Sequence, residues 1–350
     1  MMISRIDPRS DPRWQAFLEN HPHASIFHTS AWLEALRRTY GYETVVYASN
    51  VSGRGLVNGI PFCQIRSRLT GRRLVSLPFS DHCQPLVDNP EEVHELLAAV
   101  KDDARKNSCK YFEIRPLASY EPHVITAGQL TKSHDAVIHR LDLRRNIHDI
   151  FRGFHKDCIQ RKIARSEREE VRYEEGTSED LLGKFYRLLL LTRRRHQLPP
   201  QPLLWFRNLI GCLGDSLKIR VASTKEGTPV ASMITLSFKN VVTYKYGCSD
   251  PRFNALGGMV LLTWRTIQEA RANGAVELDL GRSDHDTPGL ITFKDHWGAS
   301  RHGLTYYTYP ARVTRLSTDG VFITAARRIV TAVPDSLFAT LGGLLYRHVG

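Results

Sequence analysis

The sequence predicts a mixed α/β (α+β) fold made of two similar domains in tandem. At 350 residues the chain is long for a single domain, and its 42% of apolar residues suffice for a full core. Strand-like and helix-like runs are mixed in both halves. In each half a strand hairpin is followed by one long helix and one more strand, which indicates an ancient duplication.

The first half contains three expected helices, over about residues 12–20, 31–39 and 91–107. Thr29 or Ser30 can cap the second helix, and Pro90 lies near the start of the third. Runs rich in apolar and β-branched residues predict strands over 44–49, 56–65, 73–79, 110–114 and 136–143.

The second half follows a similar plan. Helices are expected over about 147–168, 178–196 and 202–213. Strands are expected over 216–223, 230–238, 241–247, 275–280 and 304–309. One more helix, from about 259 to 273, lies between the third and fourth of these strands.

A shift of 166 positions superposes the two halves. Glu113 then falls on Asp279, and Ala104, Arg105 and Asn107 fall on Ala270, Arg271 and Asn273. The first copy has no glycine pair before its helix and carries the acidic segment 88–91 there instead. Since acidic residues repel a phosphate, we expect an anion site only in the second copy.

The stretch from Asp250 to Met259 follows a predicted strand and opens a predicted helix. Its glycine pair leaves backbone N–H groups unpaired at the helix start, and the helix dipole adds partial positive charge. We therefore expect Asn254, Gly257, Gly258 and Met259 to hold a pyrophosphate or a developing oxyanion. A plain turn is the alternative, because a glycine pair alone is a weak motif.

The chain lacks the marks of a secreted or membrane-spanning protein. No run of about 18 apolar residues occurs, and the N-terminal segment has no signal-peptide pattern. Six scattered cysteines without a C-x-x-C pair fit reduced thiols. We expect the protein to be cytoplasmic.

The net charge of +12 predicts attraction to phosphate-rich partners or anionic lipid headgroups. Basic residues gather between positions 152 and 168, Arg161 and Arg165 among them, and this group favours an anionic partner such as tRNA. Zinc-finger, basic-zipper and clear helix-turn-helix patterns are missing, so sequence-specific DNA binding is unsupported.

The run Tyr244-Lys-Tyr-Gly-Cys-Ser-Asp250, the helix after it and the run Phe293-Lys-Asp-His-Trp-Gly298 resemble the FemABX-type aminoacyltransferases and their relatives in the GNAT acyltransferase superfamily. Phe27-His-Thr-Ser-Ala-Trp32 resembles the segment that leads into that family's first acceptor-side helix. Arg161-Lys-Ile-Ala-Arg165 resembles the segment before its second domain. The resemblance covers about residues 14 to 310.

This resemblance implies two tandem GNAT-like domains, each a mixed, mainly antiparallel sheet flanked by helices. Residues 1–145 would form the acceptor side without a donor site, and residues 146–312 would hold the donor and the catalytic site. Residues 313–350 would form an amphipathic helical tail.

Members of the family transfer an acyl group, often an amino acid from aminoacyl-tRNA, to an amine of a peptidoglycan precursor, and other GNAT relatives use acetyl-CoA. The resemblance therefore implies an acyltransferase whose site stabilises a tetrahedral oxyanion. Lys294 matches the lysine of the family's Phe-Lys pair, whose implied role is to face that negative charge. An exposed lysine on a short helix is the alternative.

Other residues receive roles from the same comparison. Tyr246 lies where the GNAT fold usually separates two parallel strands, and its hydroxyl can orient the carbonyl or relay a proton; a core aromatic is the alternative. Tyr244 is expected on the same strand face. Asp284 can take the proton of the amine or merely shape a turn. Arg282 can bind a carboxylate or phosphate of the acceptor.

The remaining expected substrate contacts are Phe293 and Trp297 beside Lys294, and His28 and Trp32 on the acceptor side. For His28 and Trp32 simple packing is the alternative. The run from Asp284 to Asp286 invites a metal, but adjacent side chains on an extended segment diverge, so no metal is predicted.

Asp335 and Ser336 can cap a helix in the tail, in which one face carries Leu337, Phe338, Leu341, Leu344 and Leu345. This helix either docks on the protein or lies on a membrane surface, where an enzyme acting on a lipid-linked envelope precursor would benefit from it.

Three functions stay open at this point. The first is transfer of an aminoacyl or acyl group to an amine of a cell-envelope precursor, a peptidoglycan or polysaccharide. The second is acetyl-CoA-dependent N-acetylation of a small-molecule or sugar amine, which the glycine pair favours. The third is a non-catalytic protein that binds RNA or membrane. The sequence leaves the donor, the acceptor and the oligomeric state open.

Overall fold

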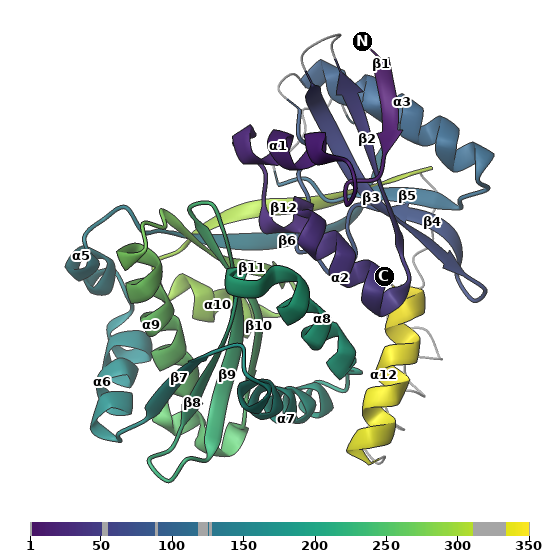
Figure 1. Ribbon diagram of the computed structural model, residues 1–350. Helices are drawn as coiled ribbons and strands as arrows, with labels where there is room; N and C mark the ends of the chain where they lie inside the picture. Colours follow the sequence, from purple (N-terminus) through teal and green to yellow (C-terminus); the bar gives the residue numbers. More distant parts are fainter. Residues whose placement is uncertain are drawn as a thin grey trace. The chain divides into compact units, whose positions relative to one another are not determined.

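The computed structural model describes residues 2–50, 55–87, 90–117, 125, 128–310 and 334–349 (Figure 1). These residues divide into two compact units. The first holds the described residues up to 136 together with 303–310 and 344–349, and the second holds 137–302 and 334–343. The chain therefore passes into the second unit within β6 (Thr131–Asp142) and returns within β12 (Ser300–Tyr309).

The first unit is a mainly antiparallel sheet in the strand order β1-β2-β3-β4-β5-β12. Its own strands are β1 (Met2–Ile6), β2 (Glu43–Asn50), β3 (Leu56–Ser67), β4 (Gly71–Val75) and β5 (Tyr111–Ile114). Its helices are α1 (Pro12–Asn20), α2 (Ser30–Tyr40) and α3 (Pro90–Lys106). Each predicted element of this half is present, whereas the edge strand β1 was not predicted.

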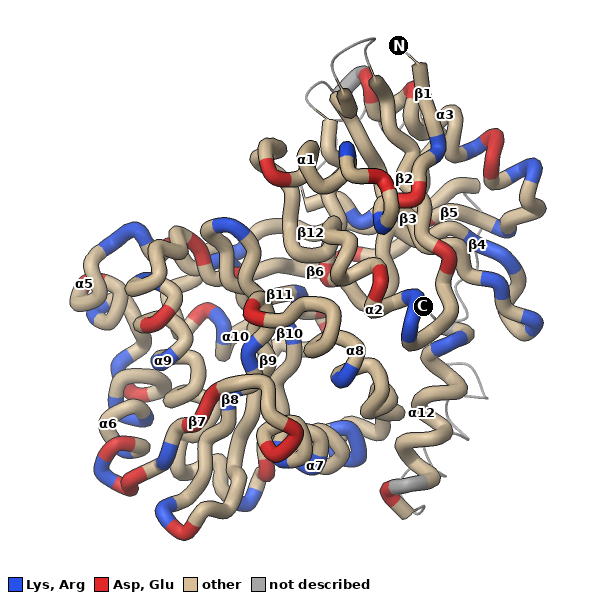
Figure 2. The backbone as a smooth tube through the Cα atoms, in the orientation of Figure 1, with Lys and Arg blue, Asp and Glu red and all other residues tan. Residues whose placement is uncertain are grey.

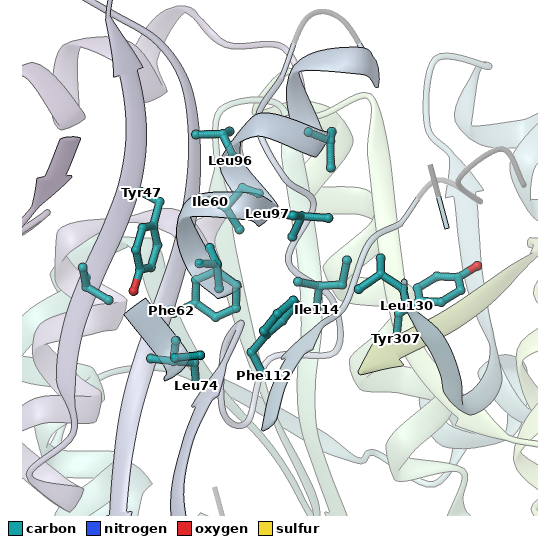
Figure 3. Close-up of a cluster of buried hydrophobic side chains, with 14 residues drawn as sticks. Tyr47, Ile60, Phe62, Leu74, Leu96, Leu97, Phe112, Ile114, Leu130 and Tyr307 are labelled. Atoms are coloured by element: carbon teal, nitrogen blue, oxygen red, sulfur yellow. The ribbon is translucent and has the colours of Figure 1, made fainter. Parts of the chain in front are cut away.

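Helix α3 packs its apolar residues on the sheet of the first unit (Figure 3). Leu96 and Leu97 of the helix lie against Phe62 of β3 and Phe112 of β5, and all four side chains are fully buried. Tyr307, from β12, belongs to the same cluster. The returning strand thus completes the core of this unit.

The second unit has the strand order β6-β11-β10-β9-β8-β7. Its further strands are β7 (Arg172–Gly176), β8 (Leu217–Ser223), β9 (Pro229–Phe238), β10 (Val241–Ser249) and β11 (Glu277–Asp284). Its long helices are α7 (Glu179–Arg195), α8 (Leu203–Leu213) and α9 (Gly258–Ala272), and a short one is α10 (Pro288–Asp295). Within this unit α7 and α9 cover opposite faces of strands β8 to β10 (Figure 1).

The two units repeat one motif, as the sequence predicts. In the first, β4 and β5 form a parallel pair that is connected through α3, and its last partners are Val75 and Glu113. In the second, β10 and β11 form a parallel pair that is connected through α9, and its last partners are Thr243 and Asp279. Glu113 and Asp279, which the 166-residue shift superposes, therefore hold the same register position. The predicted tandem mixed α/β fold is confirmed.

The helix predicted over 147–168 is wrong as one element. The structure has α5 (Ile147–Arg152), the π-helical turn η2 (Lys156–Gln160) and α6 (Arg161–Arg168) instead. The break has a tertiary cause. The N–H of His155 donates to the carbonyl oxygen of His296 at 2.8 Å, and the ring of Phe154 packs edge-on against Trp297. These contacts outweigh the local helix preference.

The tail contains the predicted helix, α12 (Asp335–Val349). Within the second unit Arg194 pairs with Asp335 and lies over the ring of Phe338, which is fully buried. Within the first unit the hydroxyl of Tyr42 donates to the carbonyl oxygen of Tyr346 at 2.7 Å. The structure thus supports docking on the protein, although Leu337, Leu344 and Leu345 remain exposed.

Among the residues that the structure describes, no helix has both the length and the apolar character that a membrane crossing requires. Contact of α12 with a membrane surface stays a prediction. Asp88 and Asn89, part of the acidic segment expected before α3, and residues 313–333 of the tail lie outside the described residues.

Candidate active site

Strands β10 and β11 of the second unit are paired at their start and separate farther along. In the described structure their parallel pairing consists of three residue pairs and ends at Thr243 and Asp279. β10 continues to Ser249 and β11 to Asp284 without pairing with each other. This is the strand separation that the resemblance placed near Tyr246. Main-chain groups of both strand ends are therefore candidates to meet a ligand.

A β-bulge at Lys245 changes the expected faces of the two tyrosines. Tyr244 lies opposite Thr235 of β9, and Tyr246 lies opposite the next residue, Ile234, so the extra residue turns the two side chains to opposite faces. The prediction that Tyr244 and Tyr246 share a face is therefore wrong. Sequence alternation alone does not reveal a bulge.

Tyr246 lies on the face covered by α7 and α8. Its hydroxyl accepts a hydrogen bond from Trp205 Nε1 at 2.8 Å, and its ring packs edge-on against Phe206. Tyr244 lies on the α9 face, where its hydroxyl is 3.9 Å from the sulfur of Met259. Burial raises the pKa of Tyr244 well above its usual value, so this hydroxyl stays protonated. Tyr244, rather than Tyr246, faces the start of α9.

The start of α9 has the form expected of an anion site. Gly257 adopts a left-handed backbone with φ +74° and is the N-cap of the helix, without a capping side chain. Its N–H donates to the carbonyl oxygen of Asn254 at 3.3 Å. A Cβ at Gly258 would lie 2.9 Å from a methyl group of Val230. Gly257 is therefore required by its backbone conformation and Gly258 by its close packing on Val230, and anion binding at this helix start stays a prediction.

Lys294 is buried, with 3% of its surface exposed. Its Nζ donates to the carbonyl oxygens of Gly281 at 2.7 Å and Arg282 at 3.0 Å. Both acceptors belong to the part of β11 beyond the strand separation. Gly281 has φ +73°, and its N–H donates to Asp279 Oδ1 at 2.7 Å. The alternative of an exposed lysine is therefore wrong.

His139 of β6 lies close to this lysine and was not predicted. It is fully buried, and its Nε2 is 3.2 Å from Asp295 Oδ1. Burial, followed by the positive charge of Lys294, lowers the pKa of His139, so the imidazole is neutral near pH 7. The bond to Arg301 lowers the pKa of Asp295. No local signal identifies His139, because a strand histidine of this kind is usually core.

Arg282 and Asp284 lie at the end of β11 and form an ion pair at 3.3 Å with side chains about one-third exposed. The carbonyl oxygen of Asp284 also accepts from the N–H of Thr287 at 3.0 Å, so Asp284 does shape the turn before α10. The carboxylate remains next to Arg282 and within the same short segment as the acceptors of Lys294. The structure therefore brings Lys294, Arg282 and Asp284 together.

The four aromatic and histidine residues expected at the substrate are mostly packed. Trp297 is fully buried in the core of the second unit, against Phe154, and Phe293 is half-buried beside it. In the first unit Trp32 is fully buried against Phe27, and His28 Nε2 bonds the carbonyl oxygen of Gln84 at 2.8 Å. Packing accounts for Trp297, Trp32 and His28, and their substrate contacts stay predictions.

Arg161 and Arg165 lie on the exposed surface of α6. Arg161 pairs with Asp157 at 2.7 Å, and Arg165 is 3.8 Å from Glu169. Acidic residues lie near the basic ones along this segment (Figure 2). Neighbouring carboxylates partly neutralise these arginines, which weakens the attraction of this surface for a large polyanion. Binding of tRNA by this surface stays a prediction.

The family model described as an acetyltransferase (GNAT) domain matches residues 154–294. These residues are a GNAT acyltransferase domain. The matched range holds the strand separation, the start of α9 and Lys294, whereas His139 and Asp295 lie outside it. The predicted class of enzyme, an acyltransferase, is confirmed. No curated protein matches the sequence.

Three solved structures share the fold. FemX has a TM-score of 0.71 at 14% identity, with 88% of this chain and 97% of FemX covered. The tandem GNAT protein from the clavulanic acid biosynthesis pathway has a TM-score of 0.57 at 13% identity, with 88% and 98% covered. The C-terminal domain of a putative lysylphosphatidylglycerol synthetase from Agrobacterium fabrum has a TM-score of 0.54 at 13% identity, with 89% of this chain and 94% of that domain covered. These likenesses confirm the expected FemABX-like, tandem GNAT fold.

Proposed function

We propose that the protein transfers an aminoacyl or acyl group from an activated donor to an amine of a cell-envelope precursor. The observation that carries the proposal is the separation of β10 from β11 beside the uncapped start of α9. Such a separation exposes main-chain groups to an acyl chain, while the helix start attracts the negative charges of the donor. The GNAT domain favours an acyl-CoA donor, whereas the resemblance of the sequence motifs to FemABX-type aminoacyltransferases favours aminoacyl-tRNA.

The proposed reaction needs few groups. The amine nitrogen bonds to the carbonyl carbon of the donor, the bond to the leaving sulfur or oxygen breaks, and one proton passes from the amine to the leaving group. Lys294 is proposed to stabilise the oxyanion between these steps, since an ammonium in a dry site interacts strongly with developing negative charge. Asp284 is the candidate to receive the proton of the amine.

The acceptor is proposed from the proteins that share the fold. FemX and a putative lysylphosphatidylglycerol synthetase are among the structures that this chain resembles, and the second name refers to an aminoacylated lipid. Arg282, one-third exposed at the end of β11, is proposed to bind a carboxylate or phosphate of the acceptor through two parallel hydrogen bonds. An acceptor whose anionic group is bound by Arg282 would place its reacting amine near Asp284.

Calorimetric titration with acetyl-CoA and with a mixed pool of aminoacyl-tRNA distinguishes the donors. Subsequent incubation with radiolabelled donor and either lipid-linked or nucleotide-linked envelope precursors tests transfer. We expect binding of one of the two donors and transfer of its label to the precursor amine. Binding of acetyl-CoA alone, with label on a small amine, would establish the N-acetyltransferase alternative instead. Binding of neither donor would favour the non-catalytic alternative.

A further inference from the structure

Three potential metal ligands meet at the break between α5 and η2. One ring nitrogen each of His155 and His296 and the sulfur of Cys158 lie within 4.8 Å of one another. The ring centroids of the two histidines are 4.4 Å apart. His155 is exposed, and the other two side chains are half-buried. Imidazole nitrogen and thiolate sulfur are the ligands that zinc prefers in proteins.

The backbone already holds these residues together. The N–H of His155 donates to the carbonyl oxygen of His296 at 2.8 Å, which ties η2 to the end of α10. His155 is the N-cap of the π-helical turn η2 and Cys158 lies within it, and π-helical turns often mark functional sites. A metal would therefore find its three ligands positioned by main-chain contacts made without it, which reduces the entropy lost on binding.

Zinc binding requires small local changes. In a tetrahedral site with zinc–ligand bonds of about 2.0 to 2.3 Å, the ligand atoms stand roughly 3.5 Å apart, so the three atoms must move closer. His155 Nδ1 accepts from the N–H of Cys158 at 3.2 Å, and this bond is given up, because Nδ1 either binds the metal or carries the ring proton. The exposed His155 ring has room for this movement.

We propose that His155, Cys158 and His296 form a zinc site whose fourth position is open to water. Lys294 lies two positions before His296 in the chain, at the end of α10. Zinc would fix that end of α10 against η2 and so restrict the backbone from which Lys294 reaches β11. The metal is assigned a positioning role and takes no part in acyl transfer.

The sequence prediction of no metal rested on the run from Asp284 to Asp286, on the scattered cysteines and on the lack of any other evident ligand cluster. The ligands proposed here come from two segments far apart in sequence, His155-x-x-Cys158 and His296. Only the fold brings them together. The H-x-x-C spacing was the available signal, but it is weak without its third ligand.

The test uses full-length protein stripped with a chelator and then titrated with Co²⁺, a spectroscopic stand-in for zinc. We expect one equivalent of metal per chain, a thiolate-to-cobalt absorption band, and a rise in the unfolding temperature when zinc is added. Cys158→Ser should abolish the band and weaken zinc binding at least about tenfold. Cys212→Ser, which changes a half-buried cysteine of α8, is the matched control and should bind as the wild type does.

His155→Gln provides a second variant, because the exposed side chain can change without disturbing the core. It should weaken zinc binding to a similar degree, with only a small fall in the unfolding temperature of the metal-free state from the loss of the bond to the Cys158 N–H. Unaltered affinity in both Cys158→Ser and His155→Gln would overturn the proposal, as would cobalt bound without the thiolate band. Either result would mean adventitious binding by surface histidines.

Discussion

Lys294 is a buried cation held by the carbonyl oxygens of Gly281 and Arg282. Two carbonyl dipoles satisfy part of its hydrogen-bonding capacity without cancelling its charge. The pKa of the neighbouring His139 is lowered, so this ring adds no competing positive charge near pH 7. The proposed role of Lys294 requires its ammonium group beside the part of β11 that no longer pairs with β10.

Lys294→Met should lower turnover strongly while retaining most of the packing. Loss of one oxyanion-stabilising group typically lowers kcat by roughly 10²- to 10³-fold, and we expect such a loss with little change in the KM for the donor. Steady-state kinetics measures both constants. Lys225→Met, at an exposed turn, is the control and should be unaffected. An unchanged kcat in a folded Lys294→Met protein would remove this lysine from the site.

Because His28 is buried, we expect the free energy of unfolding of the first unit to depend on pH. Burial lowers the pKa of His28 to about 4, from about 6.5 in an unfolded chain. The unfolded state therefore binds the extra proton first, and stability is lost as the pH falls from about 6.5 to about 4, by roughly 3 kcal/mol for this group. Urea unfolding across this range should show a shallower slope for His28→Gln. The exposed His23→Gln is the control and should retain the wild-type slope.

The residue-level predictions relied on a motif where one was available, and the catalytic roles that they assign stay predictions. The Phe-Lys pair drew attention to Lys294. The burial of this lysine depends on the packing of α10 against β11, which no local sequence pattern encodes. His139 escaped notice for the same reason, since its partner Asp295 lies on another element. Trp32, by contrast, packs as its apolar character alone suggests.

Among the elements, the start of α9 is the one on which the donor site depends. Gly257 sits at φ +74°, and a Cβ there would lie 3.0 Å from the carbonyl oxygen of Lys162 in α6. The first N–H groups of α9, which have no acceptor earlier in the helix, follow directly after it. A shift of this residue would therefore displace the groups proposed to bind the donor.

Gly257→Ala should weaken donor binding and lower stability by about 1 to 2 kcal/mol, because a side chain at this backbone conformation is strained. Gly227→Ala in the turn between β8 and β9 is a matched control. Gly227 also has a left-handed backbone, φ +91°, but a Cβ there would meet no atom within 4 Å. Both variants should unfold at a lower temperature than the wild type, and only Gly257→Ala should raise the Kd for the donor. Equal donor affinity in the two variants would contradict the assignment.

Element boundaries could be predicted where capping was local. Thr29 caps α2 and Ser178 caps α7, and both helices start within a residue or two of expectation. The prediction of a single helix over 147–168 was wrong because the helix is interrupted by contacts with His296 and Trp297, which lie far away in the sequence. β7 was missed because its residues, Arg172 to Gly176, are largely charged and form an edge strand.

For the molecule as a whole, the duplication was visible in the sequence, but the exchange of strands between its halves was not. β12 pairs with β5, and its residue Tyr307 lies opposite Ile114. Such long-range pairing leaves no local signal beyond a strand-like run. Each unit is consequently built from discontinuous parts of the chain, and the core of the first unit depends on residues near position 307.

The central claim is that the donor binds in the second unit, between the start of α9 and the end of β11. Amide hydrogen exchange measured by mass spectrometry, with and without a saturating donor, tests it most directly. We predict slower exchange of the amides in 257–261 and 280–283, with the largest change at the start of α9. Unchanged exchange in both segments, together with protection elsewhere in the chain, would contradict the account.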